Sequence, residues 1–183
     1  MIKIRIHGRG GQGNVTLGQL IAMAAFYDGK MAQAFPNFGV ERKGAPVFTY
    51  VKIDKQFIKS RQQIYNPDFI IIQDPGLINI MNVFEGAKKN AVVVINSNKM
   101  PGEICPRYTG KVYCVPVLEI ALRIIGKPII NTSMLGVFAK ISGLITLNSS
   151  KKAISVNLGE KFDQDIINKN IRALEEAYKS TEI

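Results

Sequence analysis

A glycine-rich segment near the amino terminus carries the residues whose types and spacing best suit binding chemistry. It follows an alternating apolar stretch at 2–7 and precedes apolar residues at helical spacing over 15–25. Glycine accepts positive φ angles and lets the backbone approach an anion closely, while a helix N-terminus offers free N–H groups and partial positive charge. The sequence therefore predicts an anion-binding or partner-binding loop made of Gly8, Arg9, Gly10, Gly11, Gln12 and Gly13.

The spacing of Gly8, Gly10 and Gly13 matches the first half of a dinucleotide-binding fingerprint, but its second half is missing. Such a site needs an acidic residue about 20 residues further on, at the end of the second strand. That region reads Gln-Ala-Phe-Pro, while Asp28 comes too early and Glu41 too late. A stand-alone oxidoreductase using NAD or a flavin is therefore a minor alternative. A different phosphate-bearing ligand, a subunit contact, and a tight turn that binds nothing all stay open.

A second unusual segment is the connector at 33–46, which mixes aromatic, charged and turn residues. Apolar side chains interleaved with charges are typical of a protein interface with a polar rim. The alternative is an ordinary loop whose phenylalanines pack into the core, and spacing alone does not separate the two. The candidate interface residues are Phe35, Phe38, Glu41, Arg42 and Lys43.

The remaining reactive side chains do not form a catalytic set, and we expect neither a catalytic residue nor a metal site. The single histidine, His7, stands at the end of the predicted first strand without metal ligands at suitable spacing. Cys105 and Cys114 are expected to be free thiols, because two cysteines are too few for an iron–sulfur cluster in this chain alone. Asp74 follows a buried strand, where α/β proteins bind ligands, but we favour it as the N-cap of the next helix.

The charge is concentrated in the first third of the chain. The 183 residues carry 24 lysines and arginines against 14 acidic residues, a formal net charge of +10. Residues 1–60 hold nine of those basic residues and three of the acidic ones. A basic excess is often only a solvated surface, but this clustering favours an anionic ligand or an acidic partner protein. Nucleic acid is disfavoured, because the sequence has no long basic run, no zinc-finger spacing and no aromatic–basic RNA-binding motif.

Strands and helices are predicted to alternate. Fully apolar runs at 69–72, 91–95 and 112–115 predict strands buried on both faces. The pattern indicates a single domain over 1–183 of the α/β class, a three-layer α/β/α, Rossmann-like fold around a largely parallel sheet. The chain starts with a strand pattern and has no clean apolar stretch of about 20 residues, so we expect a cytoplasmic protein without membrane contact. Other strands are expected at 2–7, 30–35 and 47–51, and helices at 15–25, 77–84, 116–125, 129–144 and 163–178.

Two long motifs resemble one protein family. Residues 4–13 (IRIHGRGGQG) and 33–47 (QAFPNFGVERKGAPV) are similar to the gamma subunits of pyruvate (2-oxoacid):ferredoxin oxidoreductases. The resemblance continues at 67–75, 128–136 and 158–162, so it covers essentially the whole chain. The Glu-Arg-x-Gly-Ala-Pro motif of the connector favours the pyruvate branch of the family over the 2-oxoglutarate branch.

The resemblance implies a hetero-oligomeric enzyme of anaerobic metabolism with labour divided among subunits. Such enzymes convert pyruvate, coenzyme A and oxidised ferredoxin to acetyl-CoA, CO2 and reduced ferredoxin. The resemblance implies that the partners of this chain are the alpha, beta and delta subunits of the same enzyme. Ferredoxin or flavodoxin is implied to interact with the assembled complex. Thiamine diphosphate, Mg and iron–sulfur clusters are implied to lie elsewhere in the complex. The isolated chain is expected to bind none of these cofactors and to be inactive.

Two roles for the chain are compatible with this resemblance. In the first, the loop at 8–13 contacts the anionic end of coenzyme A, and Arg42 or Lys43 adds electrostatic steering. In the second, the chain is a purely structural interaction subunit, and the enzyme that contains it is a 2-ketoisovalerate or 2-oxoglutarate:ferredoxin oxidoreductase.

Overall fold

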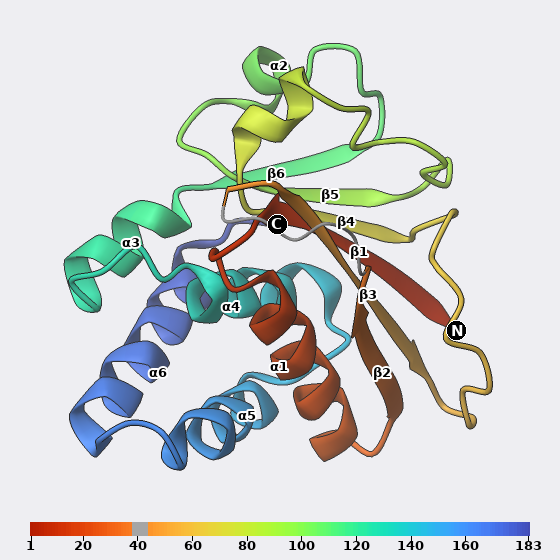
Figure 1. The fold of residues 1–183 in the computed structure, drawn as a ribbon. Helices are drawn as coiled ribbons and strands as arrows, with labels where there is room; N and C mark the ends of the chain where they lie inside the picture. The colour runs from red at the N-terminus through yellow and green to blue at the C-terminus, as the bar shows by residue number, and fades with distance from the viewer. Residues whose placement is uncertain (38–43) are drawn as a thin grey trace.

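The computed structural model describes residues 1–37 and 44–183, which build a six-stranded sheet in the order β2-β3-β1-β4-β5-β6. β4 and β5 lie near its middle and are the most uniformly apolar strands, as the runs in the sequence predict. Figure 1 shows this sheet running through the molecule with the long helices on one side of it. The strands are β1 (Ile2–Arg9), β2 (Met31–Pro36), β3 (Pro46–Asp54), β4 (Phe69–Ile72), β5 (Val92–Asn96) and β6 (Lys111–Val115).

The sheet is parallel over β1, β4, β5 and β6. β3 lies between β1 and β2 and runs antiparallel to both. Its register with β1 pairs Arg9 with Pro46, which places the end of the 33–46 connector beside the glycine loop. The α/β class is confirmed, and the predicted parallel core is present with one antiparallel insertion among the described strands.

One face of the sheet is covered by a layer of helices: α1 (Asn14–Tyr27), α3 (Val117–Ile124), α4 (Asn131–Ser142), α5 (Leu147–Gly159) and α6 (Gln164–Ser180). The innermost is α4, whose Met134, Leu135 and Phe138 are fully buried. Gly136 lets α4 lie directly against α6, because a Cβ there would stand 2.2 Å from the carbonyl oxygen of Leu174. The largest apolar cluster of the chain fills the space between these helices and the sheet.

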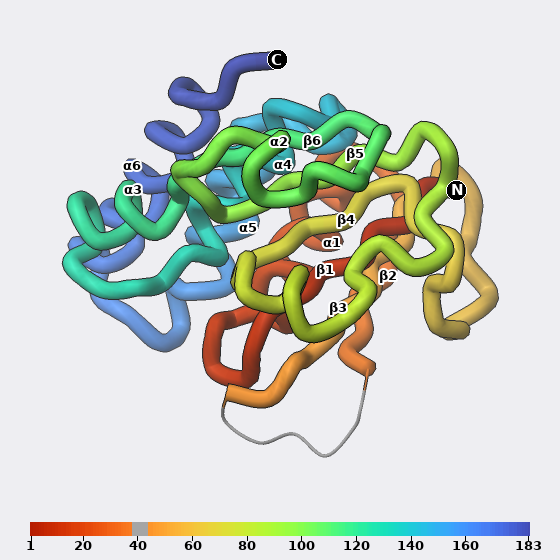
Figure 2. The backbone as a smooth tube through the Cα atoms, turned by 90° about the horizontal axis from the view of Figure 1, so that it is seen from above, coloured from red at the N-terminus to blue at the C-terminus, as the bar shows by residue number. Residues whose placement is uncertain are grey.

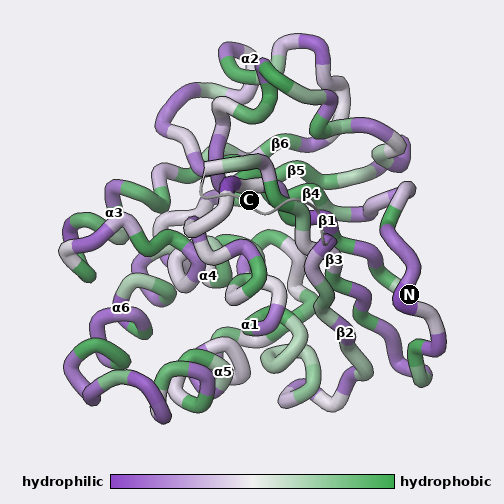
Figure 3. Tube along the Cα trace, viewed as in Figure 1, coloured by the Kyte–Doolittle hydropathy of each residue, from purple (hydrophilic) through white to green (hydrophobic). Residues whose placement is uncertain are grey.

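The opposite face carries shorter structure: the 3-10 helix η1 (Pro75–Asn79), the helix α2 (Pro101–Ile104) and their flanking segments. Seen from above in Figure 2, the segment with α2 lies over β5 and β6. Side chains from η1, α2 and their flanking segments bury the second apolar face of β4 and β5, which includes Ile70, Ile72 and Val93. Figure 3 shows the corresponding hydrophobic stretches along these strands.

Two sequence expectations differ from the structure. The helix predicted over 77–84 is wrong beyond the 3-10 turn, because the chain then bends so that the carbonyls of Val83 and Glu85 accept hydrogen bonds from the buried Arg5. α5 was not predicted, since its polar sequence has weak helical periodicity. It is anchored instead by Asp28, whose carboxylate accepts hydrogen bonds from Thr146 and Ser149. Within the described ranges, no helix combines the length and apolarity that crossing a membrane demands.

Candidate functional site

The glycine loop lies at the point where the sheet changes its direction of winding. The chain leaves β1 through α1 toward β2 on one side, whereas β4 pairs with β1 on the other side and continues to β5 across the opposite face. Open α/β sheets bind ligands at such a point, outside the carboxyl ends of the strands. The predicted loop therefore occupies the position in the fold that favours a ligand.

Gly11 and Gly13 adopt positive φ angles, +93° and +77°, that only glycine accepts readily. Gly13 is the N-cap of α1 and has no side chain to accept hydrogen bonds from the first turn. The N–H groups of that turn have no acceptor within the helix, so they are available to an anion at the loop. A second helix start meets the loop here, because a Cβ on Gly13 would lie 2.8 Å from Nδ2 of Asn131, the first residue of α4.

Other polar groups of the loop are used internally. The Arg9 N–H donates to Oε1 of Gln12 at 2.7 Å, and the Gln12 N–H donates to the Arg9 carbonyl at 3.0 Å. The Gly10 N–H donates to the carbonyl of Ala45 at 2.9 Å, which joins the loop to the connector. Gln12 and Gly10 therefore shape the loop, and its exposed tip is left to Gly11.

Arg9 and Asp74 form an ion pair across the carboxyl ends of β1 and β4. Arg9 Nε donates to Oδ2 of Asp74 at 2.5 Å, and Arg9 Nη1 donates to the carbonyl of Gly44 at 3.1 Å. The other carboxylate oxygen of Asp74 accepts the Gly76 N–H at 2.8 Å, so the predicted N-cap role is confirmed for η1. Arg9 is a third exposed on its side chain, and its charge is held at the loop by this pair.

A row of buried amides lies beneath the loop, and sequence reasoning missed it. Asn14 Nδ2 donates to the carbonyl of Val47 at 3.0 Å, and its Oδ1 accepts a hydrogen bond from Gln73 Nε2. Asn96 Nδ2 donates to the Gln73 carbonyl at 3.1 Å, and Asn96 Oδ1 accepts the Leu118 N–H at 3.1 Å. Gln73 and Asn96 each stand at the end of an apolar run, and this polar residue after a strand is the signal that could have identified them.

A cavity of about 410 Å³ lies next to this row, over the ends of β4, β5 and β6. Its lining includes the amide of Asn96, the lysine Lys99 and one carboxylate, Glu119, together with Gly76. A Cβ on Gly76 would lie 3.7 Å from Nη2 of Arg9, so the cavity adjoins the Arg9 guanidinium. The site thus combines an open helix N-terminus, an arginine and a neighbouring cavity, which together suit a phosphate-bearing ligand.

His7 is not exposed at a strand end, because β1 continues to Arg9 and the ring is only 2% exposed. Its Nε2 accepts a hydrogen bond from Arg5 Nε at 3.0 Å, and its ring meets Phe48 edge-on, with 4.9 Å between ring centroids. Burial, with the nearby Arg5 charge, lowers the pKa of His7 to about 3. A neutral buried imidazole of this kind supports the fold and is not placed to exchange protons with a ligand.

The cysteines are free thiols, as predicted. Burial raises the pKa of Cys105, and burial with the neighbouring Cys105 raises the pKa of Cys114 to about 11. Neither thiol is activated. Within residues 1–37 and 44–183, no three histidine, cysteine or carboxylate side chains gather as metal ligands would.

The connector is described only at its two ends. Phe35 is half-buried in β2, 5.5 Å from the Tyr50 ring and 5.4 Å from Lys52 Nζ, measured to ring centroids. It thus packs partly on its own sheet. The other candidate interface residues, Phe38, Glu41, Arg42 and Lys43, lie outside the described residues.

Comparisons with known proteins agree with these motifs. A family model described as pyruvate ferredoxin/flavodoxin oxidoreductase matches residues 3–180. The chain is 49% identical to "Pyruvate synthase subunit PorC" of Methanocaldococcus jannaschii, over 97% of this chain and 96% of that protein. It is 42% identical to "Pyruvate/ketoisovalerate oxidoreductases common subunit gamma" of Pyrococcus furiosus, over 100% of this chain and 98% of that protein.

A solved structure shows the same fold. The pyruvate oxidoreductase subunit PORC of Thermotoga maritima superposes with a TM-score of 0.87 at 32% identity, covering 99% of this chain and 97% of that one. The matches extend over nearly the full length of this chain and of each relative. The chain therefore belongs to the pyruvate ferredoxin/flavodoxin oxidoreductase family.

Proposed function

We propose that this chain is the gamma subunit of a cytoplasmic pyruvate:ferredoxin oxidoreductase and that its glycine loop contacts the anionic end of coenzyme A. The whole chain, 1–183, would act as one unit beside alpha, beta and delta subunits, with ferredoxin or flavodoxin as electron acceptor of the complex. The relatives named as PorC and as a common gamma subunit support the subunit assignment. The observation that carries the ligand assignment is the open N-terminus of α1 beside Arg9 at the switch point of the sheet.

The cofactors of the reaction would be held by the other subunits. The chain contains two cysteines, against the four thiolates that an iron–sulfur cluster takes. Thiamine diphosphate, when bound in the complex, supplies the electron sink for decarboxylation. The residues of this chain would instead orient the acyl acceptor. N–H groups of the loop would bind its phosphates, and the Arg9 guanidinium would donate a charge-assisted hydrogen bond to them.

Arg9→Ala in the assembled complex is expected to raise the KM for coenzyme A with little change in kcat. Loss of a hydrogen bond to a charged group costs about 1.5–3 kcal/mol, which corresponds to roughly a 10- to 150-fold increase in that KM.

Asp74→Asn is expected to lower the KM for coenzyme A, because it removes the negative charge beside Arg9 while an amide oxygen can still accept the Gly76 N–H. Initial rates against coenzyme A concentration would measure both effects.

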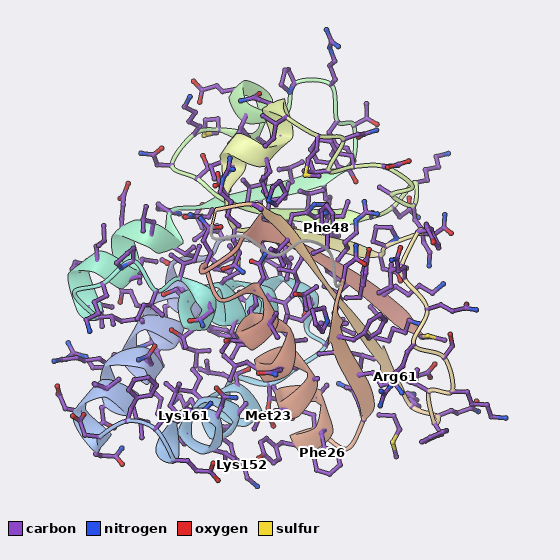
Figure 4. The ribbon with its side chains drawn as sticks, viewed as in Figure 1. Met23, Phe26, Phe48, Arg61, Lys152 and Lys161 are labelled. Atoms are coloured by element: carbon purple, nitrogen blue, oxygen red, sulfur yellow. The ribbon has the colours of Figure 1, made fainter. Side chains whose placement is uncertain are left out.

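Arg61→Ala is the matched control. Arg61 is exposed and follows β3, whose carboxyl end lies at the amino end of β1, away from the loop (Figure 4). A fully assembled Arg9→Ala complex with an unchanged KM would refute the coenzyme A contact and leave the subunit assignment intact.

The alternative function is assembly of the complex alone. The hydrogen bonds between the loop and the connector support this alternative. Gly44 and Ala45 are hydrogen-bonded to the loop, so a partner seated on the connector would reach both motifs. Under this alternative, Phe38→Ala lowers co-purification with the other subunits, and complexes that do assemble retain the normal KM for coenzyme A. The same design applies if the oxoacid is 2-ketoisovalerate or 2-oxoglutarate.

A further inference from the structure

A second cavity, of about 540 Å³, lies in the helical layer, and neither Arg9 nor Asp74 lines it. It is bounded by α1, by the first turn of α4 and the segment before it, by the end of α5 and by the start of α6. Its volume lies within the range typical of small-molecule sites. No described residue of the glycine loop or of the connector belongs to its lining, but the cavity approaches the loop through Asn131, whose Nδ2 would lie 2.8 Å from a Cβ on Gly13.

The base of the cavity consists of side chains that belong to the core. Leu20, Thr132 and Asn170 line it although each is almost completely buried. The polar groups of this base already have partners: Thr132 Oγ1 donates to Asn170 Oδ1 at 3.0 Å, and Asn170 Nδ2 donates to the carbonyl of Ile166 at 2.8 Å. A ligand at the base would therefore meet satisfied or apolar groups, which suits a hydrocarbon or aromatic body.

The mouth of the cavity combines apolar and cationic side chains. Phe162, 48% exposed, and Ile129, 39% exposed, form its apolar rim. Lys127, Lys161 and Lys169 also line it, and none of the described lining residues carries a carboxylate. Figure 4 shows Lys161 near the end of α5, beside α6.

Nearby acidic residues leave two of these lysines without an ion pair. Asp165 pairs with Lys169 at 2.6 Å, and Asp163 caps α6 by accepting the Ile166 N–H at 2.9 Å. Among the ion pairs of the described residues, none includes Lys127 or Lys161. Two ammonium groups at the entrance of an apolar cavity select for negative charge on whatever enters.

We propose that this cavity binds a small anionic amphiphile, a molecule with an apolar chain or ring system and one terminal carboxylate, sulfonate or phosphate. The apolar body would lie against the half-buried Leu158 and Ile166, and the charged end would lie at Lys127 and Lys161. A small molecule fits better than a protein surface, because the cavity has the volume of a small-molecule site. This site does not depend on the coenzyme A contact of the glycine loop.

The test uses the full chain and 8-anilinonaphthalene-1-sulfonate, whose fluorescence rises in an apolar site, with decanoate and decanol as competitors. We expect saturable binding, with decanoate displacing the probe at lower concentrations than decanol. Lys127→Glu/Lys161→Glu is expected to weaken probe and decanoate binding by about tenfold or more at low salt. Asn157→Phe, which fills the cavity from α5, is expected to abolish saturable binding.

Matched controls separate the cavity from the surface in general. Lys59→Glu/Lys89→Glu makes the same charge change at exposed positions outside the cavity, and Ser155→Phe places the same ring on an exposed position of α5. All variants are first compared by thermal unfolding. Equal effects of the test and control variants, or equal displacement by decanoate and decanol, would overturn the proposal.

Two further outcomes show whether coenzyme A or a partner subunit occupies the cavity instead. If coenzyme A displaces the probe competitively, the cavity belongs to the coenzyme A site and the separate site is refuted. If the probe binds the isolated chain but not the assembled complex, a partner subunit covers the cavity and the proposal also fails. Binding that persists in the complex and resists coenzyme A supports it, whatever the outcome for Arg9.

Discussion

Gly8→Ala is expected to lower the free energy of unfolding by about 3 kcal/mol and to displace the first turn of α1. A Cβ at this position would lie 2.2 Å from Oδ1 of Asn14, which is buried beneath the loop. Asn14 would have to move, and its hydrogen bonds with Val47 and Gln73 would be lost in a buried setting. Buried polar groups left without partners account for most of the expected cost. Urea unfolding of the purified chain would measure it.

Gly11→Ala is the control for this prediction. Gly11, unlike Gly8, has a positive φ, so alanine there costs about 1–2 kcal/mol of backbone strain. Nothing lies within 4 Å of its Cβ position, so no neighbour has to move. In a double-mutant cycle, Gly8→Ala with Asn14→Ala should cost less than the two single changes added together, because each disrupts the same hydrogen bonds. Strict additivity would contradict the proposed clash.

Three glycines of the loop therefore have different structural roles. Gly8 makes room for Asn14, and Gly13 caps α1 in a left-handed conformation beside Asn131. Gly11 forms the open tip of the loop. The sequence pattern predicts the loop and its helix, but the reason for Gly8 depends on the buried Asn14 side chain, which the pattern does not reveal.

Local patterns were sufficient for much of the fold. The alternating and fully apolar runs predicted all six described strands, and the apolar periodicities predicted α1, α3, α4 and α6. The cap at Asp74 was also predictable, because Asp followed by Pro after a buried strand is a short-range signal. α5 was not, since its position depends on Asp28 more than 100 residues earlier in the chain.

The sequence predicts the glycine loop of the candidate site, but it does not predict the ion pair and the buried amides around the loop. The ion pair joins Arg9 to a residue 65 positions away. The amide row joins Asn14 at the start of α1 to Gln73 and Asn96 at the ends of β4 and β5. These pairings follow from strand order, and the insertion of β3 beside β1 is not evident from the sequence. The same insertion brings Gly44 and Ala45 to the loop.

Mild acid is expected to destabilise the chain through His7. The pKa of its imidazole falls from 6.5 to about 3 on folding, chiefly because burial disfavours the charged ring and secondly because Arg5 is close. Between these two values the unfolded chain binds a proton that the folded chain does not, so stability falls as the pH falls from about 6.5 toward 3. The slope is about 1.4 kcal/mol per pH unit, or about 2 kcal/mol lost by pH 5 and about 4 kcal/mol near pH 3.5.

The hydrogen-bond geometry explains why protonation cannot be accommodated in place. His7 Nε2 accepts from Arg5 Nε, so a second proton on the ring would face a donor and a positive charge. Arg5 cannot turn away freely, because its guanidinium also donates to the carbonyls of Val83 at 3.0 Å and Glu85 at 2.6 Å. Protonating His7 would therefore disturb the segment that covers β4 and β5.

His7→Gln isolates this contribution, because its amide oxygen can accept from Arg5 and does not titrate. Urea unfolding of both proteins at pH 7.5 and pH 5 should show the stability difference between the two pH values shrinking by about 2 kcal/mol in the variant. Asp28 and Asp54, whose pKa values folding lowers, lose their contributions only nearer the ordinary carboxylate range and do so in both proteins. Equal losses in wild type and variant over this interval would show that the buried Arg5–His7 pair tolerates the proton.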